Sequence, residues 1–217
     1  QAFTQTMTKS VEVILREVLS QPTAPYREGW VLDHVRNELK RMKTPFIEDR
    51  WGNIIAGVTS AKALRASKRV ALVAHTDHPG FHLVKQLKRS GNKTLWQARW
   101  HGGFPPKVQK SKVAIHNPSI PSTVVRGQIA SKEIHKKTKL FEIAIPTAKS
   151  GGLNSKCFGA FDFQGFKKTG HRISTRAADD HAGVSIILGT LQKLNAKTKR
   201  HFLGIFTRAE ETGFQGA

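Results

Sequence analysis

The sequence is poor in cysteine and contains no long apolar run. Its 217 residues include a single cysteine, Cys157, so no disulfide can form within the chain. One cysteine is compatible with a reducing compartment, and we expect a cytoplasmic protein. No apolar run approaches the roughly 20 residues that a membrane-spanning helix needs. The opening residues QAFTQTMTKS also lack the apolar segment of a secretory signal, so we expect no membrane partner.

Acidic residues are scarce as well. Only 15 Asp and Glu accompany 36 Lys and Arg, which gives a net charge of +21. Such an excess favours anionic partners, namely nucleic acid, an acidic membrane surface or acidic peptides. The basic residues are spread along the chain, however. The densest runs, 107–112 and 135–139, are not interleaved with aromatics as in recognisable nucleic-acid modules. A solvated basic surface is the simpler interpretation, and nucleic acid is kept as an alternative partner.

The first third of the chain has the periodicity of an α/β fold. Apolar residues recur at helical spacing over 10–19 and again over 30–42. Gly52-Asn53 predicts a hairpin turn within 49–58. The segment 69–81 opens with a continuous apolar run, which is typical of a strand buried on both faces.

The middle of the chain has a different texture. Between Phe81 and Gly165, short β-prone runs such as TLWQARW and LFEIAIPTA are separated by Gly and Pro, and no helix is predicted. We expect a small β-barrel-like inserted domain over 80–165. Helical spacing returns over 182–196, followed by a buried strand over 200–211. The whole pattern predicts an α/β fold, a three-layer sandwich in which helices flank a mixed sheet.

The predicted sandwich core is therefore discontinuous, formed by 1–79 and 166–217. Three groups of polar side chains lie at the ends of its strands or at the start of its helix: His75 and Asp77, Asp179-Asp180-His181, and Glu210-Glu211. Because ligands bind at the carboxyl ends of strands in open α/β sheets, these groups are candidates for one site.

The chemistry of these groups suits a metal. Histidine nitrogen and carboxylate oxygen are the ligands of hydrolytic zinc sites. A ligand histidine usually donates its other ring N–H to a carboxylate, and Asp77 is placed for that. Of two adjacent glutamates, one can bind metal while its neighbour acts as general base. Singly, each group has a simpler interpretation as a hydrogen-bonded histidine, a helix N-cap or a solvated turn. Together, at strand ends, they favour a site.

The motifs VALVAHTDHPGF, RAADDHAG and FTRAEETGFQGA occur in this order and resemble the TET-type glutamyl and deblocking aminopeptidases, a family of dinuclear zinc enzymes. The family pattern is His-x-Asp-x-x-Gly-Phe, then Asp-Asp-x-x-Gly, then Glu-Glu-x-Gly-x-x-Gly-Ala. DRWGNIIAGV and GGFPPKVQKSKVAIHN are similar to two softer family segments. The resemblance covers most of the chain and is weak between 117 and 170.

The resemblance implies a metal-dependent aminopeptidase that acts on peptides. It implies two divalent metal ions, zinc in the first place and cobalt or manganese as alternatives. The implied roles are metal binding by His75, Asp179 and Glu211, with Asp179 bridging, general-base catalysis by Glu210, and orientation of His75 by Asp77. It also implies a cis peptide bond between Asp179 and Asp180, and a homo-oligomer formed through the inserted domain.

The chain also departs from the family pattern. The family supplies an aspartate soon after the Glu-Glu motif and a histidine near its C-terminus, and neither occurs before Ala217. We therefore expect the N-terminal part of a longer protein, a chain completed by another, or a truncated product that binds metal poorly. His181 replaces a usual arginine. We expect a helix-start residue facing solvent, and the alternative is a residue that shifts substrate or metal preference. Cys157 is expected to be a small packing residue.

Two other functions stay open. One is a catalytically impaired, strongly basic binding protein on the same scaffold. The net charge of +21 and the two absent metal ligands favour this interpretation. The other is a related dinuclear amidohydrolase, such as a deacylase or a carboxypeptidase, because these relatives share the order of the motifs.

Overall fold

A computed structural model of the chain describes residues 8–65 and 68–216. They divide into two compact units, one formed from 8–21, 28–65, 68–76 and 164–216 and the other from 22–27 and 77–163. The sequence had placed 22–27 with the core. These residues cluster with the second unit because the Pro25 carbonyl accepts a 2.7 Å hydrogen bond from His82, against which the Tyr26 ring also packs.

The first unit is an α/β unit built on a four-stranded sheet. Its elements are α1 (Val11–Leu19), α2 (Gly29–Arg41), β1 (Phe46–Glu48), β2 (Ile54–Ala56), α3 (Ala61–Arg65), β3 (Val70–His75), β10 (Lys167–Thr169), β11 (Arg172–Ser174), α4 (Ala178–Lys193), α5 (Ala196–Lys199), β12 (Phe202–Thr207) and the 3-10 turn η2 (Glu210–Thr212). The sheet order is β1-β2-β12-β3, and only the β12–β3 pair is parallel. β10 and β11 form a separate hairpin.

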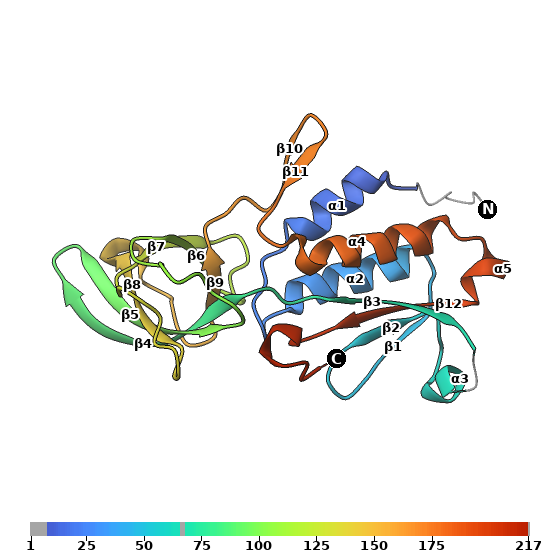
Figure 1. Cartoon of the computed structure of the whole chain (residues 1–217), viewed down its shortest axis with the longest axis horizontal. Coiled ribbons are helices and arrows are strands. Elements are labelled where there is room, and N and C mark those ends of the chain that lie inside the picture. Colours follow the sequence, from blue (N-terminus) through green and yellow to red (C-terminus); the bar gives the residue numbers. More distant parts are fainter. Residues whose placement is uncertain (1–7, 66–67, 217) are drawn as a thin grey trace. The chain divides into compact units, whose positions relative to one another are not determined.

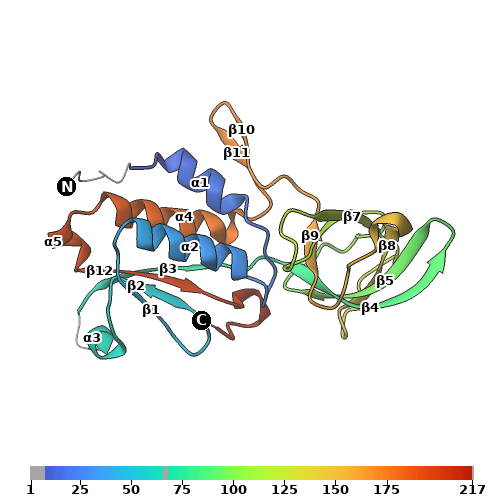
Figure 2. The same cartoon turned by 180° about the vertical axis from the view of Figure 1, so that it is seen from behind.

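Helices α1, α2 and α4 lie on one face of this sheet (Figures 1 and 2). Their apolar stripes meet the strands in one buried cluster, which includes Leu39 of α2, Leu188 of α4 and Phe206 of β12. The helix predicted over 10–19 is confirmed as α1. The Ser10 side chain caps this helix by accepting a hydrogen bond from the Val13 amide. None of the described helices is long and apolar enough to cross a membrane.

The opposite face of the sheet is more open. A small cluster around Ile55 and Leu203 packs there, with Leu64 of α3 against it. β3 is an edge strand of the described sheet, and its Val70 and Val73 are 57% and 58% exposed. The prediction that this strand is buried on both faces is therefore wrong for the described chain, because Ala74 packs against the helices on one face while Ala71 and Val73 are exposed on the other.

The second unit is a closed six-stranded barrel. Its strands are β4 (Gly80–Ser90), β5 (Lys93–His101), β6 (Lys112–His116), β7 (Val124–Ile129), β8 (Leu140–Pro146) and β9 (Phe158–Phe161), in the order β4-β5-β8-β7-β6-β9, with a 3-10 turn η1 (Thr147–Lys149) after β8. Cys157 lies fully buried in the barrel core, as its assignment to packing predicts. Gly159 lets β9 pass between its neighbours, because a Cβ there would lie 2.3 Å from the Ala114 carbonyl oxygen.

Candidate active site

The site is assembled where β3 and β12 end. The two strands are parallel, and His75 pairs in register with Thr207, so the residues that follow each strand emerge at the same edge of the sheet. The His75 Nε2 atom lies 3.1 Å from Asp179 Oδ1 and 3.8 Å from Glu210 Oε2. An imidazole thus faces carboxylates that come from two other parts of the chain.

The start of α4 places Asp179. The peptide bond between Asp179 and Asp180 is cis, as the family resemblance implied, and both residues have non-helical backbone angles. Asp180 accepts hydrogen bonds from the backbone amides of Gly183, at 3.1 Å, and of His75. Burial raises the pKa of Asp180, while the nearby His75 charge and these hydrogen bonds oppose the rise. Asp180 therefore ties the start of α4 to the end of β3.

His181 does not face solvent, and that prediction is wrong. Its side chain is fully buried, and its Nε2 donates to the Thr76 carbonyl oxygen at 3.1 Å. The reason is that the regular helix begins only after Asp180, which turns position 181 toward the sheet. His181 is thus a second link between α4 and the residues that follow β3.

A buried glutamate holds the turn that carries Glu210 and Glu211. Glu28 is fully buried, and one of its oxygens accepts from Arg208 Nε and Nη2 at 3.0 and 2.9 Å. Its other oxygen accepts from the Ala209 amide at 3.1 Å. Ala209 has a left-handed backbone (φ 53°), which bends the chain out of β12 just before Glu210. A glutamate at a helix start looks like a solvated residue in the sequence, and sequence reasoning missed this role.

The predicted hairpin turn supports the same segment. Asn53 Oδ1 accepts from the Arg208 amide at 2.9 Å, and Asn53 Nδ2 donates to the Gly216 carbonyl oxygen. Gly52 has φ 79°, and a Cβ there would lie 2.9 Å from Arg208 Nη1. Asn53 of the predicted turn therefore forms hydrogen bonds to Arg208 and Gly216, which flank the Glu210-Glu211 segment.

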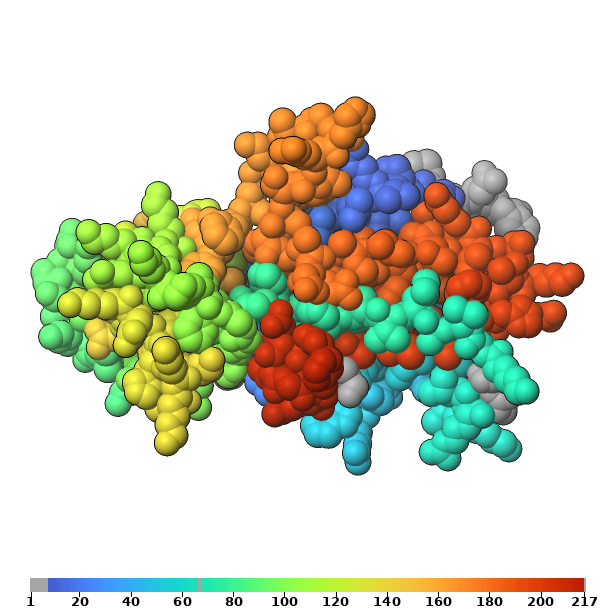
Figure 3. Space-filling model, in the orientation of Figure 1, coloured from blue at the N-terminus to red at the C-terminus, as the bar shows by residue number. Residues whose placement is uncertain are grey.

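The site is open to solvent on one side. The Asp179 side chain is 89% exposed, Glu210 is 28% exposed and His75 is 11% exposed. In the space-filling view, the segment that follows β12 lies on the surface (Figure 3, dark red). Glu211 is the next residue of η2 and is partly buried, and Asp77 is fully buried two residues after His75. The arrangement offers a solvent-accessible set of one imidazole and several carboxylates, which is the donor set of a hydrolytic metal site.

One other cluster of metal-ligand type lies in the described chain, formed by Glu17, His34 and Glu38 with ligand atoms within 4.8 Å of one another. Sequence reasoning had not singled it out. Lys9 Nζ lies 2.6 Å from Glu17 and 2.7 Å from Glu38, and Arg41 lies 2.8 Å from Glu38. Cationic side chains already neutralise these carboxylates, so the cluster is a structural ion-pair network.

Several solved structures share this fold. An aminopeptidase from the archaeon Desulfurococcus kamchatkensis has a TM-score of 0.71 and 22% identity, over 95% of this chain and 57% of its own. A TET aminopeptidase from a marine-sediment archaeon of the Thaumarchaeota has a TM-score of 0.74 and 16% identity, over 95% and 60%. The dodecamer PhTET1-12s has a TM-score of 0.70 and 19% identity, over 96% and 63%. This chain thus spans less than two thirds of each.

A search of curated protein sequences gave no significant match. The sequence model of the M42 glutamyl aminopeptidases, in contrast, matches residues 52–217. That stretch contains all three polar motifs and the barrel, and it covers well over half of the chain. The prediction of this aminopeptidase family is confirmed, and the chain belongs to the M42 glutamyl aminopeptidase family.

Proposed function

We propose that this chain contributes the catalytic site of a metal-dependent aminopeptidase that removes N-terminal residues from peptides. Membership of the M42 family supports a peptidase, and two of the solved structures with this fold are named as aminopeptidases. The observation that carries the proposal is the meeting of His75 with Asp179 and Glu210 at the end of a parallel strand pair.

We propose that the site holds two divalent metal ions, in the first place zinc. His75, Asp179 and Glu211 would supply ligands to them, together with ligands from outside this set. Held there, such ions supply Lewis acidity to the scissile carbonyl and to the attacking water. The placement of Asp179 agrees with this role, because its Oδ1 lies 3.1 Å from His75 Nε2 and both atoms are of ligand type.

The remaining steps belong to side chains of this chain. Glu210 accepts the proton of the attacking water and passes it to the leaving amine as the C–N bond breaks. Asp77 orients His75. Glu28 and Asn53 position Glu210 through Arg208 and Ala209, without touching the substrate.

The two glutamates can be told apart by experiment. Glu210→Gln should abolish peptide hydrolysis and leave metal content unchanged, since the amide cannot accept a proton. Glu211→Gln should lower both the metal content and the rate. Glu48→Gln, at an exposed ion pair with Arg36 on the edge strand opposite β3, is the matched control for the loss of one carboxylate.

The measurements are release of the N-terminal residue from an unblocked peptide and metal analysis of each purified variant. Full activity of Glu210→Gln would contradict the assignment of the general base. Glu210 Oε2 lies 3.8 Å from His75 Nε2, so Glu210 is also placed near the ligands. If only Glu210→Gln lost metal, Glu210 would be the metal ligand and Glu211 the general base.

The assembly and the complete core form a further part of the proposal. We propose a homo-oligomer, and the dodecameric state of PhTET1-12s supports this. We also propose that additional structure covers the open face of the sheet at Ala71 and Val73 and completes a three-layer sandwich, since the solved relatives extend well beyond the matched region. The single buried cysteine agrees with a cytoplasmic protein.

A further inference from the structure

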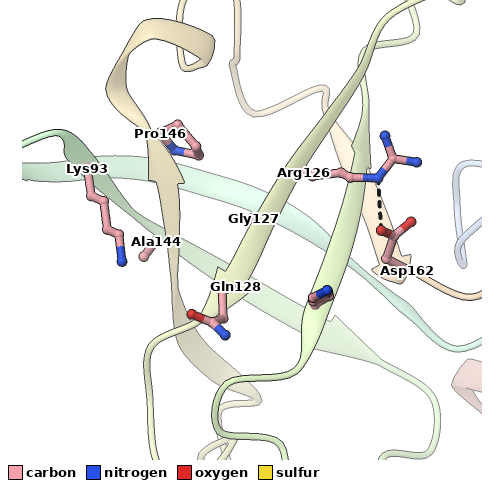
Figure 4. A pocket seen from close by; sticks show the side chains of 8 residues that line it. Lys93, Arg126, Gly127, Gln128, Ala144, Pro146 and Asp162 are labelled. Carbon is pink, nitrogen blue, oxygen red and sulfur yellow. Dashed lines mark hydrogen bonds and ion pairs between the residues drawn. The ribbon is translucent and has the colours of Figure 1, made fainter.

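The outer wall of the barrel contains a hollow of about 460 Å³ that the proposed peptidase function does not use (Figure 4). It lies over β7 and β8, which pair only at Gln128–Ala144 and Ile129–Ile143. Beyond these pairs the two strands diverge. Gly127 and Ala144 contribute almost no side chain there, which leaves the space open.

The sides of the hollow are cationic. Lys93 lies on one side and Arg126 on the other, and Lys112 also lines the hollow. Arg126 is paired with Asp162, its Nε 2.9 Å from the carboxylate, which neutralises that pair. Lys93 and Lys112 form no ion pair with the described residues, so both charges are available to an anion.

An aromatic hollow of similar volume, about 460 Å³, adjoins the cationic one. Both are lined by Lys112 and Asp162. The Phe163 side chain lines the aromatic hollow and is 64% exposed. Its ring lies 5.8 Å from that of Phe161, which in turn lies 4.9 Å from the ring of the buried Trp100. Phe163 is therefore an exposed ring on a firmly packed base.

The charge of the barrel unit favours an anionic partner. Its Lys and Arg outnumber its Asp and Glu roughly fourfold, a larger excess than in the other unit. The acidic residues of the barrel unit are Asp77, Glu133, Glu142 and Asp162. Charge alone would suit any polyanion. The exposed ring beside the two unpaired lysines is more selective, because a planar base can stack on it while the adjoining phosphate lies in the cationic hollow.

We propose that this face of the barrel binds single-stranded nucleic acid. Lys93 and Lys112 contact backbone phosphates, and a base stacks on Phe163. The proposal is independent of the peptidase site, since every residue in it belongs to the barrel unit.

The test is fluorescence anisotropy of the whole protein with a labelled oligothymidylate of about 16 nucleotides, across a range of salt concentrations. We expect Lys93→Ala/Lys112→Ala to weaken binding at low salt and to reduce the slope of log K against log salt by about 1.4, the value for two lost phosphate contacts on a single strand. We expect Phe163→Ala to weaken binding about tenfold and to leave the slope unchanged.

The matched control is Lys136→Ala/Lys137→Ala, which removes two exposed charges of the same unit that do not line the hollow. It should change the affinity by less than about twofold. Circular dichroism of each variant checks that the barrel still folds. A polyglutamate peptide serves as the competing anion without bases.

The proposal is overturned if the wild-type protein does not bind the oligonucleotide, or if the control weakens binding as much as the double variant. It is also overturned if Phe163→Ala binds as tightly as the wild type, or if polyglutamate competes as well as the oligonucleotide, because binding would then depend on charge and not on a stacked base.

Discussion

Replacing Glu28 by glutamine should loosen the turn that carries Glu210. The buried carboxylate accepts from the Arg208 guanidinium with one oxygen and from the Ala209 amide with the other. Glutamine has nearly the same shape, but one of its two polar atoms is an NH2 group. Whichever way it is turned, a donor then faces either the guanidinium or the amide.

The magnitude follows from the burial of the pair. A hydrogen bond to a charged group contributes about 1.5–3 kcal/mol, and breaking a buried ion pair costs about 3–5 kcal/mol. Arg208 is 30% exposed, so water can solvate its released guanidinium, whereas Glu28 has no exposed side-chain surface. We therefore expect a local destabilisation of about 2–3 kcal/mol, near the lower end of these ranges.

Amide hydrogen exchange reports this change directly. Protection of the Ala209 amide should fall by about 30- to 150-fold, the factor that corresponds to 2–3 kcal/mol. Peptide hydrolysis should fall with it, because Glu210 follows in the same turn. The comparison variant is Glu48→Gln, since its pair with Arg36 is exposed and should contribute less than about 1 kcal/mol.

The reasoning would be refuted if the Ala209 amide stayed as protected in Glu28→Gln as in Glu48→Gln. It would be weakened in a different way if protection were lost everywhere in the unit, because Glu28 would then support the whole fold rather than the turn.

Three further predictions concern other links in the two units. Asn53→Ala removes the acceptor of the Arg208 amide and should cost about 1–3 kcal/mol in urea unfolding. Burial lowers the pKa of His82 to about 4, so between pH 6.5 and 4 the unfolded chain binds a proton that the folded chain does not. The free energy of unfolding should therefore fall by about 1–2 kcal/mol as pH drops through this window, a value reduced because the ring is partly exposed to solvent. The check is the pH dependence of unfolding, which should be flatter for His82→Gln than for the wild type. Gly159→Ala should destabilise the barrel by about 1–3 kcal/mol or more in thermal unfolding, because its Cβ would lie 2.6 Å from the Phe81 ring.

The parts of the site that could be predicted are those whose chemistry is local in the sequence. His75 ends an apolar run, and Glu210 follows another. Parallel strands bring such ends to one edge of a sheet, so the meeting of His75, Asp179 and Glu210 agrees with the pattern. The metal roles of these residues, and those of Asp77 and Glu211, stay predictions.

The sequence by itself determined the motifs, the helix periods and the β-rich character of the insert, because each depends on residues close together in the chain. Only the tertiary structure decided that β3 lies at a sheet edge with Val73 exposed, because strand order depends on contacts between distant segments. It also decided that His181 is buried and that Glu28 holds Arg208 across 180 residues of chain. A polar side chain looks solvated in a sequence until the fold supplies its partner, and for these residues the partner lies far away in the chain.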